Sequence, residues 1–143
     1  SKQNGGKLAP HMSHRNGLDV DLPYILNTSE KSPLKMKTVV SNNKLISEFD
    51  LESQWKAFKF LVKTDKVDRI FLHKVIKKSL CQSSFVKSDL AQTTEEKTLA
   101  TETLRRLRIR ESDHADHYHL RVKCSAYDRR CQQSLPPAEG LGC

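Results

Sequence analysis

The sequence predicts an α+β domain, in which a small antiparallel sheet is flanked by two or three helices and long loops. Leu18, Val20 and Leu22 alternate with two aspartates, and residues 117–123 place two histidines opposite two aliphatic side chains. Both patterns are typical of strands with one face in the core. Residues 48–64 instead carry an apolar stripe at helical spacing. At 143 residues, we expect a single domain over 1–143.

The first half of the chain is expected to hold one strand and one helix. Residues 1–10 and 24–37 are polar and contain Gly or Pro, which favours loops. A turn at Asn16–Gly17 precedes the strand over 18–22, whose apolar side chains should face the core while its aspartates face a cleft or solvent. The helix over 48–64 begins after Asp50 as its N-cap. Its core stripe is Leu51, Trp55, Phe58 and Leu61, widened by Phe60 and Val62.

The second half is expected to alternate strands and helices. A buried strand over 67–72 leads to a short helix over 73–81, with His73 at the junction in a structural or exposed role. Residues 82–94 are polar and predict a loop. A second amphipathic helix follows over 95–107, and the histidine-bearing strand over 117–123. The tail after Cys131 is irregular.

Composition limits the partners. The net charge of +8 and the isoelectric point of about 9.4 favour a polyanion, such as nucleic acid, an anionic membrane or a cell-wall polymer. The basic residues are spread along the chain, and the densest run, 104–110, is typical of a solvated helix face or strand edge. We therefore expect no nucleic-acid partner. No apolar run approaches the roughly 18–20 residues of a membrane span.

Four cysteines, at positions 81, 124, 131 and 143, lack the CxxC spacing of a zinc cluster and favour two disulfides. Three pairings are open. Cys124 and Cys131 bracket a short polar loop and are the natural local pair, which leaves Cys81 with Cys143. The alternative is four reduced thiols in a cytosolic protein. With only 36% hydrophobic residues, the domain should need such reinforcement.

Histidines carry the strongest functional signal. Three of the six lie at positions 114, 117 and 119, and alternation puts His117 and His119 on one face of a strand. A tight turn can bring His14 beside Asp21. Catalytic zinc usually keeps three protein ligands and one open position. His14, Asp21 and His119 would form such a set on the sheet; the alternative is a surface histidine and an exposed strand aspartate.

Two further histidines could serve hydrolysis at such a zinc site. His117 is two residues from His119 on the same face, within reach of a zinc-bound water. His114 precedes the strand and can approach from the cleft wall. A neutral imidazole can act as a base and an imidazolium as a donor to a developing oxyanion. Spacing does not decide which histidine does which.

These motifs resemble the penicillin-insensitive murein endopeptidases, which are related to lysostaphin-type and D-Ala-D-Ala zinc peptidases. Residues 5–21, GGKLAPHMSHRNGLDVD, are similar to the family's first zinc motif, with six residues between His14 and Asp21. His117-Tyr118-His119 is similar to the second motif, and His114 matches the extra histidine of the endopeptidase branch. Residues 67–81 and 120–143 resemble the family's central strand and helix and its disulfide-bearing end, whereas 82–113 matches less well.

The resemblance implies a periplasmic or secreted zinc metallopeptidase that hydrolyses D-alanyl–meso-diaminopimelate cross-links of peptidoglycan. It implies that His14, Asp21 and His119 bind Zn²⁺, that His117 is the base, and that His114 stabilises the transition state. His11 matches a further family histidine. We expect His11 and Asp19 to contact substrate.

The same resemblance implies the disulfides Cys124–Cys131 and Cys81–Cys143, and cross-link peptides as partners; a homodimer is also allowed. Only ten residues precede His11, fewer than in the family, which leaves open whether an upstream segment is missing.

Two alternatives stay open. A carboxypeptidase or dipeptidase of the same zinc group would need a closed cleft that recognises a free carboxylate. A non-catalytic zinc-containing cell-wall-binding module would have a closed site with four ligands. Histidines beyond the ligand set favour an enzyme.

Overall fold

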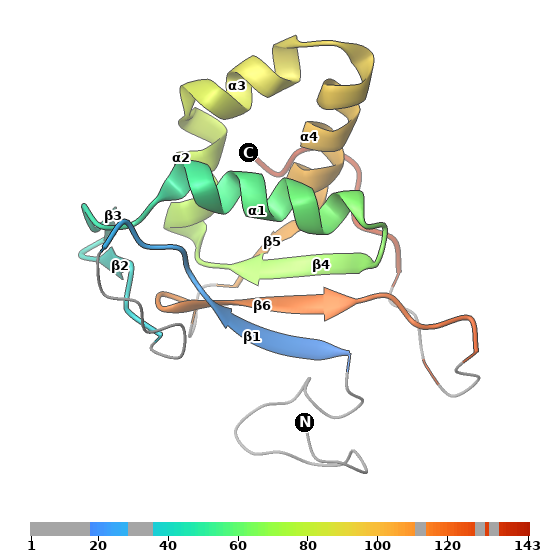
Figure 1. Cartoon of the computed structure of the whole chain (residues 1–143), viewed down its shortest axis with the longest axis horizontal. Coiled ribbons are helices and arrows are strands. Elements are labelled where there is room, and N and C mark those ends of the chain that lie inside the picture. The colour runs from blue at the N-terminus through green and yellow to red at the C-terminus, as the bar shows by residue number, and fades with distance from the viewer. Residues whose placement is uncertain (1–17, 29–35, 111–113, 128–130, 132–134) are drawn as a thin grey trace.

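The computed structural model describes residues 18–28, 36–110, 114–127, 131 and 135–143. A four-stranded sheet forms its base, in the order β1-β6-β4-β5 (Figure 1). The strands are β1 (Asp19–Pro23), β4 (Val67–Leu72), β5 (Leu107–Ile109) and β6 (His117–Val122). A separate hairpin pairs β2 (Val40–Ser41) with β3 (Lys44–Leu45). The described chain thus has the α+β class predicted from the sequence.

The sheet is mixed, not purely antiparallel as expected. β6 pairs antiparallel with both β1 and β4, whereas β5 pairs parallel with β4. The predicted helix over 95–107 therefore ends one residue earlier, and Leu107 starts an edge strand because it pairs with Ile70 and is buried. The basic run 104–110 divides between the end of a helix and this sheet edge, in agreement with the interpretation of it as a helix face or strand edge.

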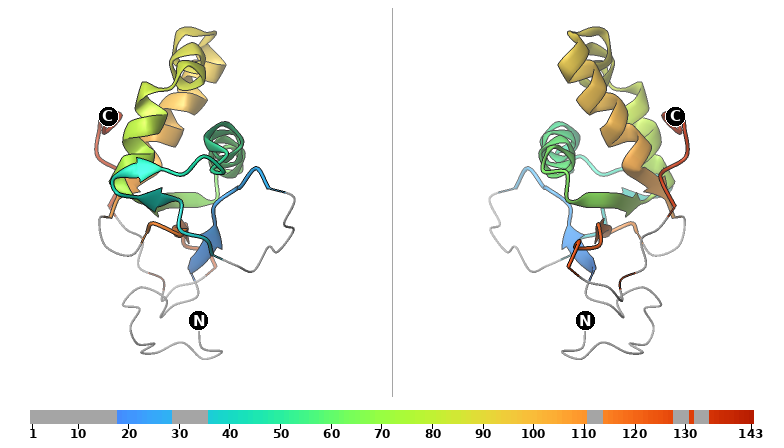
Figure 2. Two further views of the ribbon diagram at one scale, coloured as in Figure 1. Left: turned by 90° about the vertical axis from the view of Figure 1, so that its left-hand side faces the viewer. Right: turned by 90° about the vertical axis from the view of Figure 1, so that its right-hand side faces the viewer.

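Four helices lie on one side of the sheet: α1 (Leu51–Lys63), α2 (Lys74–Gln82), α3 (Ser84–Ala91) and α4 (Thr94–Arg106) (Figures 1 and 2). The prediction of a loop over 82–94 was wrong, because α3 occupies most of it. Ser83 accepts a hydrogen bond from the backbone N–H of Val86 and caps this helix, and Val86 is fully buried. A single buried side chain in a polar segment leaves little periodicity to detect.

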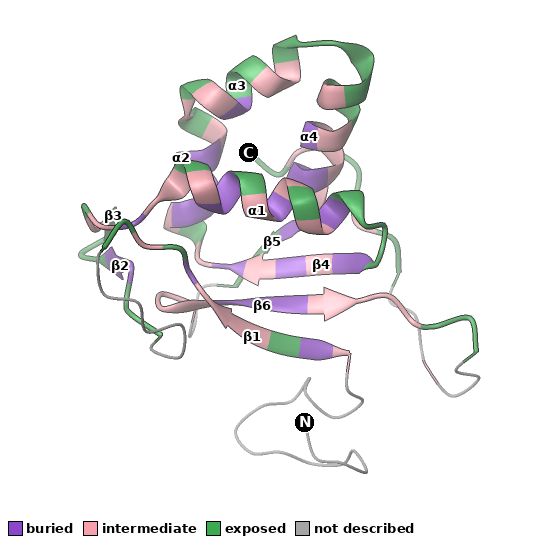
Figure 3. Ribbon diagram, viewed as in Figure 1, coloured by how far each residue is buried: buried purple, intermediate pink, exposed green. Residues whose placement is uncertain are grey.

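The core fills the space between the helices and the sheet (Figure 3). Trp55 and Phe58 of α1 are buried, as the helical stripe predicted, and Asp50 caps the helix through a 2.9 Å hydrogen bond from the Ser53 N–H. Phe60 was expected to widen the apolar face, but it is 71% exposed because it projects from the outer side of α1. Val20, expected in the core, is 43% exposed, since β1 is an edge strand.

The C-terminal residues are fastened to α2. Cys81 bonds to Cys143 and Cys124 to Cys131, which confirms the predicted pairing. Beside the first disulfide, the buried Lys77 ammonium donates to the carbonyls of Leu104 and Leu141 at 2.5 and 2.7 Å. Burial, with a smaller contribution from Arg108, lowers the pKa of Lys77 to about 8. Within the described residues, no helix is long and apolar enough to cross a membrane.

Candidate metal and catalytic site

The predicted site residues of the second motif lie on the face of the sheet opposite the helices, which we call the site face. The antiparallel register of β1 and β6 pairs Asp19 with Arg121, Asp21 with His119, and Pro23 with His117. Because alternate side chains of a strand share a face, these residues project together. Tyr118 and Leu120, between the histidines and Arg121, project into the core instead.

His119 is held between two carboxylates. Its Nε2 lies 2.8 Å from Oδ1 of Asp19, and its Nδ1 lies 3.1 Å from Oδ1 of Asp21. An imidazole that donates from Nε2 to a carboxylate presents Nδ1 as a lone pair when it is neutral. Nδ1 of His119 and Oδ1 of Asp21 therefore lie next to each other on the site face.

Asp19 is the buried anchor of this arrangement. Its side chain has no exposed area, and Arg121 donates to it twice, from Nε to Oδ1 at 2.7 Å and from Nη2 to Oδ2 at 3.2 Å. Burial raises the pKa of Asp19, but the hydrogen bonds from His119 and Arg121 outweigh it, and the net pKa is lowered. Asp19 is thus an ionised carboxylate that holds the His119 ring in place through Nε2.

His117 belongs to a second histidine–carboxylate pair. Its Nδ1 lies 2.7 Å from Oδ1 of Asp116, and its Nε2 faces Asp21 at 3.9 Å from Oδ1. A base oriented through one ring nitrogen by a carboxylate leaves its other nitrogen free to accept a proton. Sequence reasoning did not single out Asp116, although its position directly before His117 was a signal.

His114 joins the same cluster from the loop before β6. Its ring centroid lies 5.1 Å from that of His117 and 6.4 Å from that of His119. The hydroxyl of the buried Tyr24 donates to the His114 carbonyl at 3.1 Å, which ties this loop to the core. Burial raises the pKa of Tyr24, so that hydroxyl keeps its proton.

Phe71 of β4 completes the described wall of the site. It pairs in register with His119, and its ring packs edge-on against the imidazole, with centroids 5.4 Å apart. Sequence reasoning assigned the strand 67–72 to the core and did not connect it with the site. Alternation along β4, once paired with β6, places Phe71 on the site face.

The first motif lies partly outside the described residues. His11 and His14 fall there, so the structure brings together Asp21 and His119 of the predicted zinc set. The residues it describes contain no group of three or more His, Cys, Asp or Glu side chains that could hold a metal ion. Asp21 and His119 have a separation compatible with zinc, because their nearest atoms are 3.1 Å apart and tetrahedral ligands about 2 Å from a metal lie about 3.3 Å from each other. The Asp19–His119 pair has the form of the carboxylate–histidine contact that usually accompanies a zinc-bound histidine.

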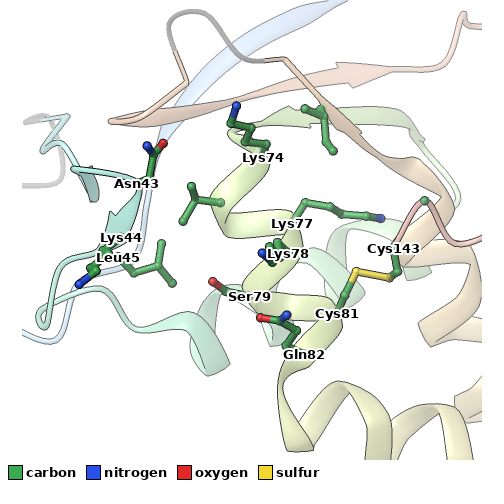
Figure 4. A pocket seen from close by; sticks show the side chains of 13 residues that line it. Asn43, Lys44, Leu45, Lys74, Lys77, Lys78, Ser79, Cys81, Gln82 and Cys143 are labelled. Atoms are coloured by element: carbon green, nitrogen blue, oxygen red, sulfur yellow. A yellow bond between two sulfur atoms is a disulfide. The ribbon is translucent and has the colours of Figure 1, made fainter.

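A separate cavity of about 940 Å³ lies beside α2, the β2–β3 hairpin and the C-terminal residues (Figure 4). Lys44, Lys74, Lys77 and Lys78 contribute to its lining, which contains neither a histidine nor an acidic residue among those described. In Figure 4 the side chains of Lys74 and Lys77 extend in different directions. None of the site residues above lines this cavity.

The whole sequence, residues 1–143, matches the pattern of the family described as penicillin-insensitive murein endopeptidase. The chain belongs to that family. Curated members with the same name resemble the chain across nearly all of its length. The one from Klebsiella pneumoniae subsp. pneumoniae is 31% identical over 151 aligned residues, which cover 98% of this chain and 47% of the relative.

Two other members give similar values. The murein endopeptidase of Pectobacterium atrosepticum is 30% identical over 151 residues, covering 97% of this chain and 47% of its own. That of Escherichia coli K12 is 29% identical over 147 residues, covering 98% and 47%. The chain therefore spans about half the length of the curated relatives it matches.

Proposed function

We propose that this chain is the catalytic domain of a zinc-dependent murein endopeptidase that hydrolyses D-alanyl–meso-diaminopimelate cross-links. The observation that supports it most is the convergence of Asp21 and His119, whose nearest oxygen and nitrogen are 3.1 Å apart, with the second nitrogen of His119 held by a buried carboxylate. Membership of the murein endopeptidase family supports the proposed reaction class. The net charge of +8 suits a substrate rich in carboxylates.

In this proposal His14, Asp21 and His119 hold Zn²⁺, which when bound supplies Lewis acidity and a water of lowered pKa. Asp19 accepts a hydrogen bond from Nε2–H of His119. Nδ1, the nitrogen that faces the metal in this proposal, therefore carries no proton. Because Asp19 is fully enclosed, we assign it this positioning role in place of the substrate contact expected from the sequence.

The two remaining histidines divide the proton chemistry. Asp116 binds Nδ1 of His117 and leaves Nε2 to take a proton from the attacking water. His114, 5.1 Å from His117 between ring centroids, is placed to donate to the developing oxyanion. His117 thus acts as the base and His114 as the stabiliser. The two disulfides support a periplasmic or secreted location, because such bonds persist in oxidising compartments.

Digestion of purified cross-linked muropeptide dimers, followed by mass spectrometry, tests the proposal. The zinc-loaded protein should convert dimers to monomers, EDTA should stop the reaction, added Zn²⁺ should restore it, and penicillin should leave it unchanged. Release of free D-alanine with the cross-link intact would instead identify a carboxypeptidase. Binding of murein without any product would identify a wall-binding module.

A further inference from the structure

Two guanidinium groups flank the ring of Phe71 next to the site. The guanidinium carbon of Arg121 lies 5.9 Å from the ring centroid, and that of Arg110 lies 5.3 Å from it. Both distances are within the range of a cation–π contact. The ring itself touches His119, with centroids 5.4 Å apart. The Phe71 ring therefore contacts Arg110, Arg121 and His119.

The two arginines differ in what else they bind. Arg121 is committed to Asp19 through two hydrogen bonds, so its charge is neutralised inside the protein. Arg110 is exposed and, within the described part of the chain, forms no ion pair. Its backbone is nevertheless fixed, because its N–H donates to the Leu72 carbonyl at 3.0 Å at the end of β4. Arg110 thus combines an anchored backbone with a stacked guanidinium whose donors have no acceptor among the described residues.

Such a group suits a carboxylate. A guanidinium presents parallel N–H donors that match the two oxygens of a carboxylate, and stacking on a ring reduces the entropy lost on binding. In a cross-link to meso-diaminopimelate, the carbon that bears the scissile nitrogen also bears a free carboxylate. A ligand with that carboxylate would carry its anionic group close to the bond to be cleaved.

We propose that Arg110, stacked on Phe71, forms a subsite for the free carboxylate on the amine side of the scissile bond. This inference rests on the proposed function and adds a specificity-determining residue to it. The subsite makes the enzyme discriminate between cross-links whose diaminopimelate carboxylate is free and those in which it is amidated. Arg110 binds substrate and takes no part in proton transfer.

The test compares two muropeptide dimers, identical except that this carboxylate is free in one and amidated in the other. Wild-type protein should cleave the free form with a kcat/KM about ten- to a hundredfold higher, the value of one charge-assisted bidentate contact. Arg110→Gln should lose that factor on the free dimer and stay within about twofold of wild type on the amide. Arg110→Lys should recover part of the loss, since it restores charge without the fork.

Lys87→Gln is the matched control, because it removes one positive charge from an exposed position on α3, on the helix side of the sheet. It should leave both dimers within twofold of wild type. Equal losses in Arg110→Gln and Lys87→Gln would reduce the effect to net charge and overturn the subsite. Equal cleavage of the two dimers by wild-type protein would overturn it as well, while the proposed function would stand.

If wild-type protein cleaved neither dimer, the proposed function would fail, and calorimetric binding of the intact dimers would decide the subsite. Arg110→Gln should then weaken binding of the free-carboxylate dimer about tenfold or more and leave the amidated dimer unchanged. Unchanged affinity for the free-carboxylate dimer would overturn the inference.

Discussion

The two faces of β6 are built from one strand but serve different purposes. Tyr118 and Leu120 point toward the helices, where the Tyr118 ring meets Phe58 edge-on at 5.1 Å. His117, His119 and Arg121 point the other way and meet carboxylates at 2.7–2.8 Å. On the helix face, a side chain is held by shape and apolar burial. On the site face, it is held by charge and hydrogen bonds, so the two faces should respond differently to substitution.

The largest expected effect is on the site face. His119→Ala should abolish zinc binding at stoichiometric metal and lower kcat/KM by about 10³-fold or more, because the loss of a ligand removes several kcal/mol of transition-state stabilisation. Metal content by atomic emission and dimer digestion measure both effects. His73→Asn is the control: His73 caps α2 through Nδ1, 3.2 Å from the Val75 N–H, and asparagine can cap as well. Full zinc content in His119→Ala would refute the site.

The neighbouring position on the helix face should show the reverse pattern. Leu120 is 6% exposed, and Leu120→Ala should lower the free energy of unfolding by about 2–5 kcal/mol by leaving a cavity. Activity per folded molecule should stay within about threefold of wild type at a temperature where the variant is folded. Urea denaturation and active-site titration with zinc separate the two quantities. If Leu120→Ala kept its stability but lost its zinc, the proposed difference between the helix face and the site face of β6 would be wrong.

A smaller effect should sharpen the comparison within the site face. Asp19→Asn keeps the size of the side chain but removes the charge that orients His119, and should weaken zinc affinity by about 10–100-fold in chelator competition. Asp116→Asn, at the other histidine–carboxylate pair, should instead keep zinc affinity and lower kcat. If Asp19→Asn left zinc affinity within twofold of wild type, the buried carboxylate would be structural only.

Sequence reasoning located the strands and helices whose patterns were regular. Alternation predicted that His117 and His119 share a face opposite Leu120, and the helical stripe predicted the burial of Trp55 and Phe58; both predictions are confirmed. The helix α3 was missed because Val86 is its one buried residue, while Phe85 and Leu90 pack against the core only partly buried. The burial of Val20 was also predicted wrongly. Its exposure depends on which strand lies beside β1 and on where the helices end, and the sequence alone does not reveal either.

The site was harder to assemble than the fold. Sequence analysis placed Asp21 and His119 in one predicted zinc set, and the structure pairs them opposite one another in the register of β1 and β6. The enclosure of Asp19 by Arg121, and the contact of Phe71 with His119, depend on pairings between strands about 50–100 residues apart in sequence, and a single sequence carries no signal for such pairings. The position of Arg110 beside Phe71 likewise depends on the pairing of β5 with β4.

The pairing of β1 with β6 also has a consequence for when the proposed site forms. Asp19 and His119 are separated by 100 residues, so their meeting closes one of the longest loops in the molecule. Contacts of such separation pay the largest chain entropy and tend to form late. Until β1 has joined the edge of the sheet, Asp21 and His119, the zinc ligands that we propose, lie apart. The site that we propose is therefore complete only when β1 has paired with β6, so its assembly reports on the completion of the sheet.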